Sequence, residues 1–524
     1  MGKNTEFKVT YTTLDPSGLE AFHEKYDQAV RNLRSRLGQS YPIYISGKEY
    51  TGFEEFKDTS PTDMEIVVGH FQKGTANALI EAVDAAYGAF KAWRDMDYRE
   101  RIKIMRRAAE LISERKYELA AIMSIEAGKS RFESMGDVEE SADLIRYYCL
   151  QMEEAKGFVR SMERLSHNEE TRSILKPYGV WMIISPFNFP LALAAGMSAG
   201  VLVAGNTAVY KPSSDAPLSG LKLYEVYRDA GIPEGVFNFI TGPGGNFQHV
   251  IFENTKISGL VFTGSSEVGL KIYNGFSRQY VRPCFLEMGG KNPAIVTESA
   301  GLDKAAEGVM KSAYSLGGQK CSACSRVYVH KKVEAAFLDK LIAHIRKIKI
   351  GDPSERDVYL GPLINQSAME TFKAWSDISR KDGKILTGGN VLSDEAFGKG
   401  FFVEPTLVTG FPKDHRIFQE ELFLPFLVEA PVDSLEEAIT ECNKVNYGLT
   451  AGIFAQNERE LQYFFDEIET GVLYANRRSG ATTGAWPGVQ SFCGWKKSGS
   501  TGKGGCGPYY VQQFMREQSH TVMK

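Results

Sequence analysis

The chain has 524 residues, 43% of them hydrophobic and 24% charged, with a formal net charge of -4. These proportions are typical of a globular protein with a large core and exclude a disordered or fibrous chain. The small negative charge provides no basic field to neutralise phosphates, so no nucleic-acid partner is expected.

The N-terminal segment and the apolar stretches argue against export and membrane insertion. Residues 1–6 contain no apolar run of the kind found in a secretion signal, and Glu6 stands where N-myristoylation requires Ser or Thr. The apolar stretches 180–184 and 191–204 both fall short of the roughly 18 to 20 residues of a membrane helix. Seven cysteines spread over the chain do not resemble a secreted disulfide framework. We expect a cytoplasmic protein that contacts no membrane.

Residues 75–155 are predicted to form a run of amphipathic helices. The apolar residues Leu79, Val83, Ala86, Phe90 and Trp93 recur at steps of four and three, which is the spacing of one helix face. Because the chain exceeds what one hydrophobic core usually supports, we expect these helices to belong to one of two domains.

Short β-rich segments alternate with helical segments after this run. Such alternation predicts βαβ units and a parallel sheet, in which ligands bind at the carboxyl ends of the strands. Several of the strands run directly into polar or glycine-bearing turns, and a cofactor is expected there. The predicted strands are 179–184, 207–211, 236–241, 260–263 and 281–287, and the predicted helices include 218–230 and 267–276.

A second set of alternating elements is interpreted as a second α/β domain, from about residue 292 to residue 471. The glycine- and serine-rich tail begins near Gly480, and its aromatic stretch 508–511 is interpreted as a segment that packs on a partner. The elements predicted in the second domain include helices at 302–314 and 333–348 and strands at 326–330 and 450–454.

Cys321 and Cys324 stand at C-x-x-C spacing, and several interpretations compete. A structural zinc site needs four ligands, and no second pair of Cys or His residues has a matching spacing. A thioredoxin-like redox pair is expected early in a small βαβ domain rather than at this position. Alternatively, Cys321 is a lone nucleophile whose thiolate is favoured by backbone N–H groups and the adjacent Lys320. A buried, inert cysteine is the remaining interpretation.

Nine sequence blocks in a fixed order resemble the aldehyde dehydrogenase superfamily over most of the chain. The resemblance implies an α/β fold with a Rossmann-like NAD(P)-binding domain, an α/β catalytic domain and a small oligomerisation segment. The blocks are 184–190, 205–213, 262–265, 286–293, 317–326, 361–364, 404–406, 420–423 and 447–450. The implied boundaries are 1–154 and 176–289 for the NAD(P)-binding domain, 290–480 for the catalytic domain, and 155–175 and 495–524 for the oligomerisation segments.

Cys321, Glu287 and Asn188 match the catalytic residues of this family. The resemblance implies that Cys321 attacks an aldehyde carbon, while the Asn188 side-chain amide and the Cys321 backbone N–H hold the oxyanion. Preorganised donors of this kind each lower the barrier by roughly 3 to 4 kcal/mol. The Glu287 carboxylate is then expected to activate the water that hydrolyses the thioester. No metal ion is implied.

The cofactor site is implied by the resemblance alone, because no predicted strand is followed by a G-x-G-x-x-G fingerprint. Lys211 is expected to bind the adenosine ribose, and the pyrophosphate is expected at the helix start after Gly264 and Ser265. Ser214 replaces a glutamate that in many members repels the 2'-phosphate, so we expect NAD with some tolerance of NADP. The implied cofactor-binding residues are Ile184, Ser185, Pro186, Phe187, Lys211, Ser213, Ser214, Gly244, Thr263, Gly264, Ser265, Val268, Met288, Gly289, Glu421 and Phe423.

The stretches 185–190 and 317–326 resemble the branch of the family that oxidises glutamate 5-semialdehyde, the open form of 1-pyrroline-5-carboxylate, to glutamate in proline degradation. In that branch a serine after the nucleophile and two backbone N–H groups bind the substrate carboxylate. The implied substrate-binding residues are Phe189, Ser322, Gly484 and Ala485.

Three features leave the substrate open. The loop 477–483 is longer than in most of the branch, Cys493 replaces a glycine, and Arg477 and Arg478 are suited to a larger or more acidic substrate. Another semialdehyde or a general aldehyde is the alternative substrate. A noncatalytic cysteine-pair protein that binds metal or switches redox state is the alternative class. The expected partners are a small-molecule aldehyde and further copies of the chain, as a homodimer or a higher homo-oligomer.

Overall fold

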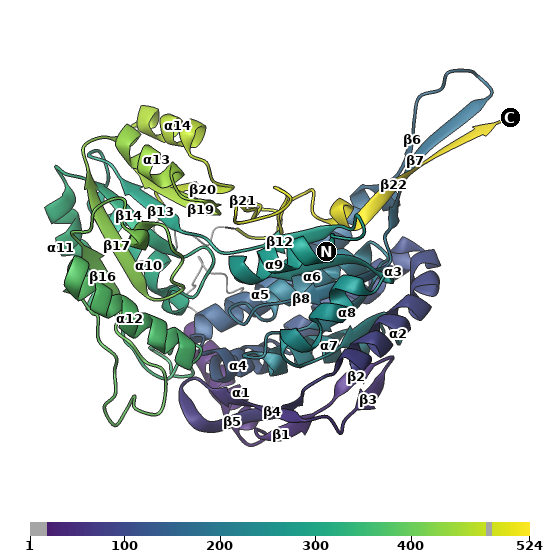
Figure 1. Cartoon of the computed structure of the whole chain (residues 1–524), viewed down its shortest axis with the longest axis horizontal. Helices are drawn as coiled ribbons and strands as arrows, with labels where there is room; N and C mark the ends of the chain where they lie inside the picture. The colour runs from purple at the N-terminus through teal and green to yellow at the C-terminus, as the bar shows by residue number, and fades with distance from the viewer. Residues whose placement is uncertain (1–17, 478–484) are drawn as a thin grey trace.

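The first sheet has seven strands in the computed structural model, which describes residues 18–477 and 485–524 (Figure 1). Five neighbouring strands are parallel, and two antiparallel strands complete one edge. In sheet order the strands are β12 (Cys284–Glu287), β11 (Ile257–Thr263), β8 (Val180–Ile184), β9 (Thr207–Lys211), β10 (Phe237–Phe239), β2 (Ile43–Ile45) and β3 (Lys48–Tyr50). The register pairs Ile184 with Lys211 and Thr263 with Glu287, so these strands end at one edge of the sheet.

Helices cover both faces of this sheet, because side chains of its central strands alternate between two cores. Val180 and Met182 pack with α2, α8 and α9, whereas Trp181 and Ile183 pack with α1 and α3 to α7. The bounds are α1 (Leu19–Arg34), α2 (Ala76–Asp95), α3 (Tyr98–Glu114), α4 (Lys116–Ala127), α5 (Arg131–Glu154), α6 (Ala192–Val203), α7 (Pro217–Asp229), α8 (Gln248–Glu253) and α9 (Ser266–Phe276). The predicted run of helices over 75–155 and the predicted parallel sheet are confirmed.

The second sheet also has seven strands, of which only the edge strand β15 is antiparallel to its neighbour. Its strands in sheet order are β15 (Lys384–Thr387), β16 (Thr406–Thr409), β17 (Phe426–Val432), β14 (Cys324–His330), β13 (Asn292–Val296), β19 (Thr450–Phe454) and β20 (Val472–Ala475). One face packs against α10 (Leu302–Tyr314) and α11 (Glu334–Ile345), and the other against α12 (Gln366–Asp382), α13 (Leu435–Asn443) and α14 (Glu458–Glu467). The predicted second α/β unit is therefore confirmed.

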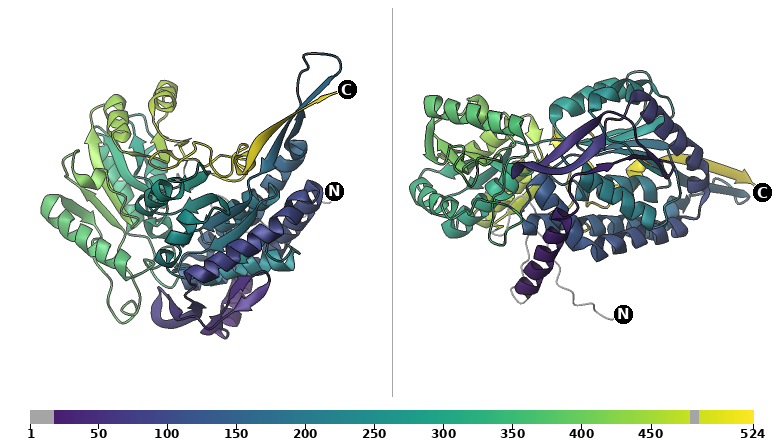
Figure 2. Two further views of the ribbon diagram at one scale, coloured as in Figure 1. Left: turned by 45° about the vertical axis from the view of Figure 1, so that its right-hand side comes forward. Right: turned by 90° about the horizontal axis from the view of Figure 1, so that it is seen from below.

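Three smaller sheets complete the fold. The first joins β1 (Gln39–Tyr41), β5 (Asp63–Gln72) and β4 (Glu55–Ser60), and the second pairs β18 (Tyr447–Gly448) with β21 (Trp495–Lys496). The third is an arm of β6 (Val159–Ser161), β7 (Glu169–Pro177) and β22 (Met515–Met523), which projects from the body with the C-terminus near its tip (Figure 2).

The structure differs from the sequence-based predictions in two segments. The strand predicted over 281–287 begins only at Cys284, since Val281 is fully exposed and Pro283 has no N–H for a ladder bond. The interpretation of 508–511 as a segment that packs on a partner is wrong for Tyr510 and Val511, which are buried in the core of this chain. In the described parts of the chain, none of the helices combines the length and apolar character needed to span a membrane.

Candidate active site

The loop that carries Cys321 enters β14 through an unusual backbone. Leu316, Gly317 and Gly318 have φ of 51°, 63° and 66°, so three successive residues are left-handed. A Cβ on Gly318 would lie 2.1 Å from the carbonyl oxygen of Leu424, so only glycine fits there. This turn fixes the direction in which the chain approaches Cys321.

Asn292 holds the same loop from β13. Its side-chain amide donates to the carbonyl oxygens of Cys321 at 2.7 Å and Ala323 at 2.9 Å. Its Oδ1 accepts from the backbone N–H of Thr450 at 3.0 Å. Asn292 lies within one of the blocks that resemble the family, but its role appears only once β13, β14 and β19 lie side by side.

Cys321 and Cys324 occupy different environments although they are close in sequence. Cys321 is partly exposed and lines a cavity, whereas the Cys324 thiol is buried and donates to the carbonyl oxygen of Arg326 at 3.3 Å. Burial raises the pKa of each thiol to about 12, and at Cys321 the nearby carboxylates of Glu421 and Glu287 add to this rise. No group of three or more His, Cys, Asp or Glu residues within 18–477 and 485–524 could hold a metal ion.

The expectation that Lys320 favours the Cys321 thiolate is wrong. The Lys320 ammonium donates to Glu133 at 2.9 Å and to the Ser315 hydroxyl at 2.8 Å. These partners hold the ammonium group, and burial raises the pKa of Cys321 above its ordinary value of 9.0, so the thiolate is not favoured. The direction of a side chain is set by its tertiary partners and not by sequence adjacency.

Asn188 reaches the cysteine loop from the end of the first sheet. Its side-chain amide donates to the carbonyl oxygen of Gln319 at 3.0 Å, and the residue is almost fully buried. Residues from the two sheets therefore meet at this point, next to Cys321. The amide is a hydrogen-bond donor bound to the loop that carries the thiol, and an oxyanion site requires such a donor.

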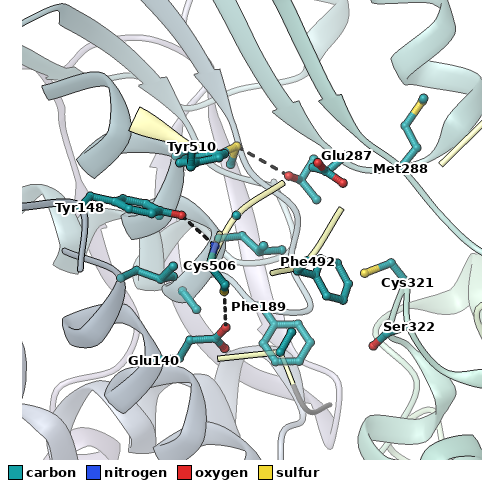
Figure 3. Close-up of a pocket in the computed structure, with 18 residues that line it drawn as sticks. Glu140, Tyr148, Phe189, Glu287, Met288, Cys321, Ser322, Phe492, Cys506 and Tyr510 are labelled. Atoms are coloured by element: carbon teal, nitrogen blue, oxygen red, sulfur yellow. Dashed lines mark hydrogen bonds between the residues drawn. The ribbon is translucent and has the colours of Figure 1, made fainter. Parts of the chain in front are cut away.

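Glu287 ends β12 and lines the same cavity as Cys321 (Figure 3). Its Oε2 is buried and has no hydrogen-bond partner among the residues that the structure describes. Burial raises the pKa of this carboxyl group well above 4.5, and the backbone N–H of Gly494 opposes the rise only in part. A carboxylate with a raised pKa and an unused acceptor is suited to take a proton from water.

The cavity has mostly apolar walls (Figure 3). Tyr510 stacks on Tyr148 with ring centroids 4.9 Å apart, and both rings line it. Phe189, Ser322 and Ala485 line it as well, whereas Gly484 and Arg478 lie outside the described residues. The lining residues that the sequence analysis did not name for this site are Glu140, Leu144, Tyr148, Ala192, Leu193, Gly196, Met197, Phe492, Gly505, Cys506 and Tyr510.

Glu140 and Cys506 form the wall of the cavity that lies away from Cys321 (Figure 3). The Cys506 thiol donates to Glu140 Oε1 at 3.9 Å, and its backbone N–H donates to the Tyr148 hydroxyl at 3.1 Å. Cys506 has a φ of 62°, so its backbone is left-handed. Arg477, which the sequence suggested for an acidic substrate, does not line this cavity, and its side chain donates to Gln490 at 3.4 Å.

The carboxyl edge of the first sheet brings together most of the residues assigned to the cofactor. Lys211 ends β9, is buried, and donates to the Pro212 carbonyl oxygen at 2.9 Å. Burial lowers the pKa of its ammonium group to about 8. Gly264 follows β11, and the Ser265 side chain caps α9 by accepting from the Val268 N–H at 3.4 Å.

The remaining assigned residues border this edge. Met288 lines the cavity. The Ser185 hydroxyl lies 3.0 Å from that of Tyr210, and the Ser213 hydroxyl donates to Asp215 at 3.4 Å. Three of the assigned residues lie at element ends or turns: Ile184 at the end of β8, Pro186 in the turn after β8, and Gly244 at the start of a 3-10 turn. Ser214 and Val268 are exposed on the surface.

Glu421 and Phe423 approach the edge from the second unit. Glu421 Oε1 accepts from the Gly290 N–H at 2.9 Å, and burial raises the pKa of its carboxyl group to about 7. A Cβ on Gly289 would lie 1.8 Å from the Glu421 carboxylate, so this contact requires glycine. The Phe423 ring meets Phe187 edge-on at 6.0 Å.

These features fit an extended dinucleotide. The edge offers a buried ammonium at Lys211, the N-terminus of the eleven-residue helix α9 for an anion, and the carboxylate of Glu421 toward Cys321. The carboxyl edge of the first sheet adjoins the cavity through Thr263, Glu287 and Met288, so one end of a bound dinucleotide can reach the Cys321 thiol.

Comparison with known proteins gives the same assignment over the whole chain. A model of the Aldehyde dehydrogenase family matches residues 48–520. The chain is 35% identical over 514 residues to 1-pyrroline-5-carboxylate dehydrogenase of Bacillus licheniformis, and 34% identical over 511 residues to 1-pyrroline-5-carboxylate dehydrogenase 1 of Halalkalibacterium halodurans. The alignments cover 97% of each chain in the first case, and 96% of this chain and 97% of the relative in the second. A crystal structure of 1-pyrroline-5-carboxylate dehydrogenase from Thermus with bound NAD superposes with a TM-score of 0.92 at 32% identity, covering 100% of both chains. The chain belongs to the aldehyde dehydrogenase family.

Proposed function

We propose that this chain is an NAD-dependent dehydrogenase that oxidises glutamate 5-semialdehyde to glutamate in proline degradation. The observation that carries the proposal is a thiol and an unpaired carboxylate that line one mostly apolar cavity, with an amide donor bound to the loop that carries the thiol. These groups are Cys321, Asn188 and Glu287. The relatives named above act on 1-pyrroline-5-carboxylate according to their names, which supports the choice of substrate.

The Cys321 thiol releases its proton to solvent water, and the resulting thiolate adds to the aldehyde carbon, whose carbonyl oxygen becomes an oxyanion. The Asn188 amide, which donates to Gln319 in this structure, and the backbone N–H of Cys321 stabilise that oxyanion. When bound, NAD accepts the hydride that leaves the carbon, and a thioester remains on Cys321. Glu287 takes a proton from water, whose oxygen attacks the thioester, and glutamate leaves as the thiol is restored.

The polar groups of the cavity suit both charges of the substrate. Ser322 and Ala485 line the same cavity as Cys321 and offer a hydroxyl and a backbone N–H for the α-carboxylate. Glu140 lies on the other wall and offers a carboxylate for the α-ammonium group. An aldehyde that lacks either charge leaves one of these groups without its ligand.

Lys211, the N-terminus of α9 and Glu421 are the residues that we propose to hold NAD. Ser214 carries no charge to repel a 2'-phosphate, so some use of NADP is part of the proposal. The other groups proposed to contact the cofactor are those that border the carboxyl edge of the first sheet.

We also propose a division of the chain into domains and an assembly. The boundary at 290 is supported by its place between β12 of the first sheet and β13 of the second. A homodimer or higher homo-oligomer through the arm is supported by the exposed side chains of Val159, Val522 and Met523 on its strands. Light scattering of the whole chain and of a variant without 515–524 tests this assembly. The cytoplasmic location remains a prediction.

The substrate proposal is tested with purified protein and NAD. Its kcat/KM is expected to be at least about 100-fold higher with 1-pyrroline-5-carboxylate than with propanal or succinate semialdehyde, because two charged contacts are lost with propanal and one with succinate semialdehyde. NADH formation at 340 nm measures it. A preference for propanal or succinate semialdehyde contradicts the substrate and leaves the chemistry of Cys321 in place.

A further inference from the structure

Two buried ion pairs lie behind the cavity wall and take no direct part in the proposed chemistry. Lys129 Nζ lies 2.7 Å from Asp137 Oδ2, and both side chains are completely buried. Lys320 Nζ lies 2.8 Å from Glu133 Oε2, with side-chain exposures of 1% and 15%. Glu133 and Asp137 are four residues apart on α5, so they lie on the same face of that helix.

The first pair contacts the segment that carries the amide donor. Lys129 Nζ donates to the backbone carbonyl oxygen of Asn188 at 2.6 Å. Asp137 Oδ1 accepts from the backbone N–H of Ala192 at 2.6 Å, at the first residue of α6. The pair therefore holds the middle of the short segment between β8 and α6, at Asn188, and its C-terminal end, at Ala192.

The second pair contacts the loop that carries the nucleophile, because Lys320 immediately precedes Cys321. The two lysines also share one aromatic neighbour. Lys129 Nζ lies 3.8 Å and Lys320 Nζ 5.7 Å from the centroid of the Phe189 ring. One face of α5 thus connects the Asn188 segment, which follows the first sheet, with the Cys321 loop, which precedes β14 of the second.

A buried ion pair adds little net stability compared with well-packed apolar residues, since removing two charges from water costs much of what their attraction returns. The charged hydrogen bonds do, however, fix directions and distances more closely than apolar packing. The position of the two pairs behind Asn188 and Cys321 therefore points to a geometric role.

We propose that Lys129, Asp137, Lys320 and Glu133 form an α5 clamp that sets the position of the Asn188 amide relative to the Cys321 thiol. The four side chains are positioning residues, because they act through Asn188, Phe189 and the cysteine loop. The inference rests on the proposed function, since it takes the oxyanion role of Asn188 as given.

The main test is Lys129→Met in the full chain, with Lys116→Met as the matched control. Lys116 pairs with Glu139 at 3.5 Å, so the control also breaks an ion pair between α4 and α5, but one that does not contact the active site. A displaced oxyanion donor is expected to lower kcat about 10- to 100-fold in Lys129→Met, whereas Lys116→Met keeps the activity of the parent. Lys129→Arg, which retains the charge and the donors, is expected to recover part of the loss.

Two further readouts separate positioning from general damage. Alkylation of Cys321 by iodoacetamide forms no oxyanion, so its rate in Lys129→Met is expected to stay within about threefold of the parent. In a double-mutant cycle, Asn188→Ala combined with Lys129→Met is expected to be no slower than Asn188→Ala alone, because the clamp acts through that amide. Additive losses, or an alkylation rate that falls as far as kcat, would overturn the inference.

The same experiments distinguish failure of the inference from failure of the proposed function. Full activity in Asn188→Ala removes the oxyanion assignment on which the clamp depends. A large loss in Asn188→Ala together with full activity in Lys129→Met removes only the clamp. If Lys129→Met does not fold, Asp137→Asn replaces it, because the amide keeps the size of the side chain and the acceptor for Ala192. Parent-like kcat in folded Asp137→Asn also overturns the inference.

Discussion

The cavity around Cys321 and the carboxyl edge of the first sheet adjoin each other but are built differently. The cavity is enclosed mainly by apolar side chains from helices and the C-terminal segment, with few polar groups. The edge consists of strand ends, turns and one helix N-terminus, so backbone groups form part of its surface. Burial in the cavity raises the pKa values of the Cys321 thiol and the Glu287 carboxyl group. The chemistry proposed for the cavity therefore depends on these individual side chains. The edge depends on backbone geometry, so single side chains there should affect binding more than chemistry.

The sharpest contrast is expected for Cys321→Ala. Without the nucleophile no thioester forms, so kcat is expected to fall by at least about 10⁴-fold, as measured by NADH formation. Cys324→Ala is the matched control, because that thiol points into the core behind the loop and should leave kcat within about threefold of the parent. Equal losses in the two variants would instead favour a paired cysteine site.

Glu287→Gln is expected to have the next largest effect. Removing the base should lower steady-state kcat about 10²- to 10⁴-fold, while one equivalent of NADH still forms in the first turnover because hydride transfer precedes hydrolysis. Rapid mixing measures this burst. Loss of the burst together with kcat would place Glu287 before hydride transfer.

The pH profile provides a second measurement on Glu287. A general base works only when ionised, and burial raises its pKa above the ordinary 4.5. The kcat of the parent should therefore fall as pH decreases through this raised pKa, at a pH where an exposed glutamate is still ionised. This decrease of kcat at acid pH should be missing in Glu287→Gln. An unchanged decrease in that variant would assign the titration to another group.

Glu140→Gln tests recognition in the cavity rather than chemistry. A hydrogen bond to a charged group contributes about 1.5 to 3 kcal/mol, so kcat/KM for glutamate 5-semialdehyde is expected to fall about 10- to 100-fold. Succinate semialdehyde has no ammonium group, so its kcat/KM should not fall. A similar decrease for both substrates would mean that Glu140 supports the cavity wall instead of binding the substrate.

The same contrast explains what could be predicted from the sequence. The ends of β8, β9 and β11 were predictable, because strand and helix patterns are local and parallel strands place their carboxyl ends together. Asn188, Glu287 and Cys321 were assigned catalytic roles only because ordered blocks resemble a known family, and these roles stay predictions. The cavity wall was missed, since Tyr148 and Cys506 meet across 358 positions of the chain and no local pattern marks such a contact.

The Lys320 prediction failed for a related physical reason. Its neighbour in sequence is Cys321, the proposed nucleophile, but its partner in space is Glu133 on α5, 187 residues away. Long charged side chains are flexible, so the position of their charge follows from the tertiary structure around them. Sequence adjacency gave the residue a role in activating the thiol, whereas the structure connects it to the clamp.

The smallest effect is expected at the cofactor edge, for Ser214→Glu. Ser214 is exposed and follows Lys211 by three positions, so a carboxylate there would face the ribose end of the dinucleotide. At the surface a like-charge contact costs about 1 kcal/mol, so kcat/KM with NADP should fall about fivefold while that with NAD changes less than twofold. Ser214→Gln is the control, because it adds similar bulk without the charge.

Since solvent ions screen exposed charges, the discrimination of Ser214→Glu between NAD and NADP should shrink as salt concentration rises. An equal decrease for both cofactors, or the same decrease in Ser214→Gln, would attribute the effect to bulk and leave the edge a surface that recognises its ligand through the backbone.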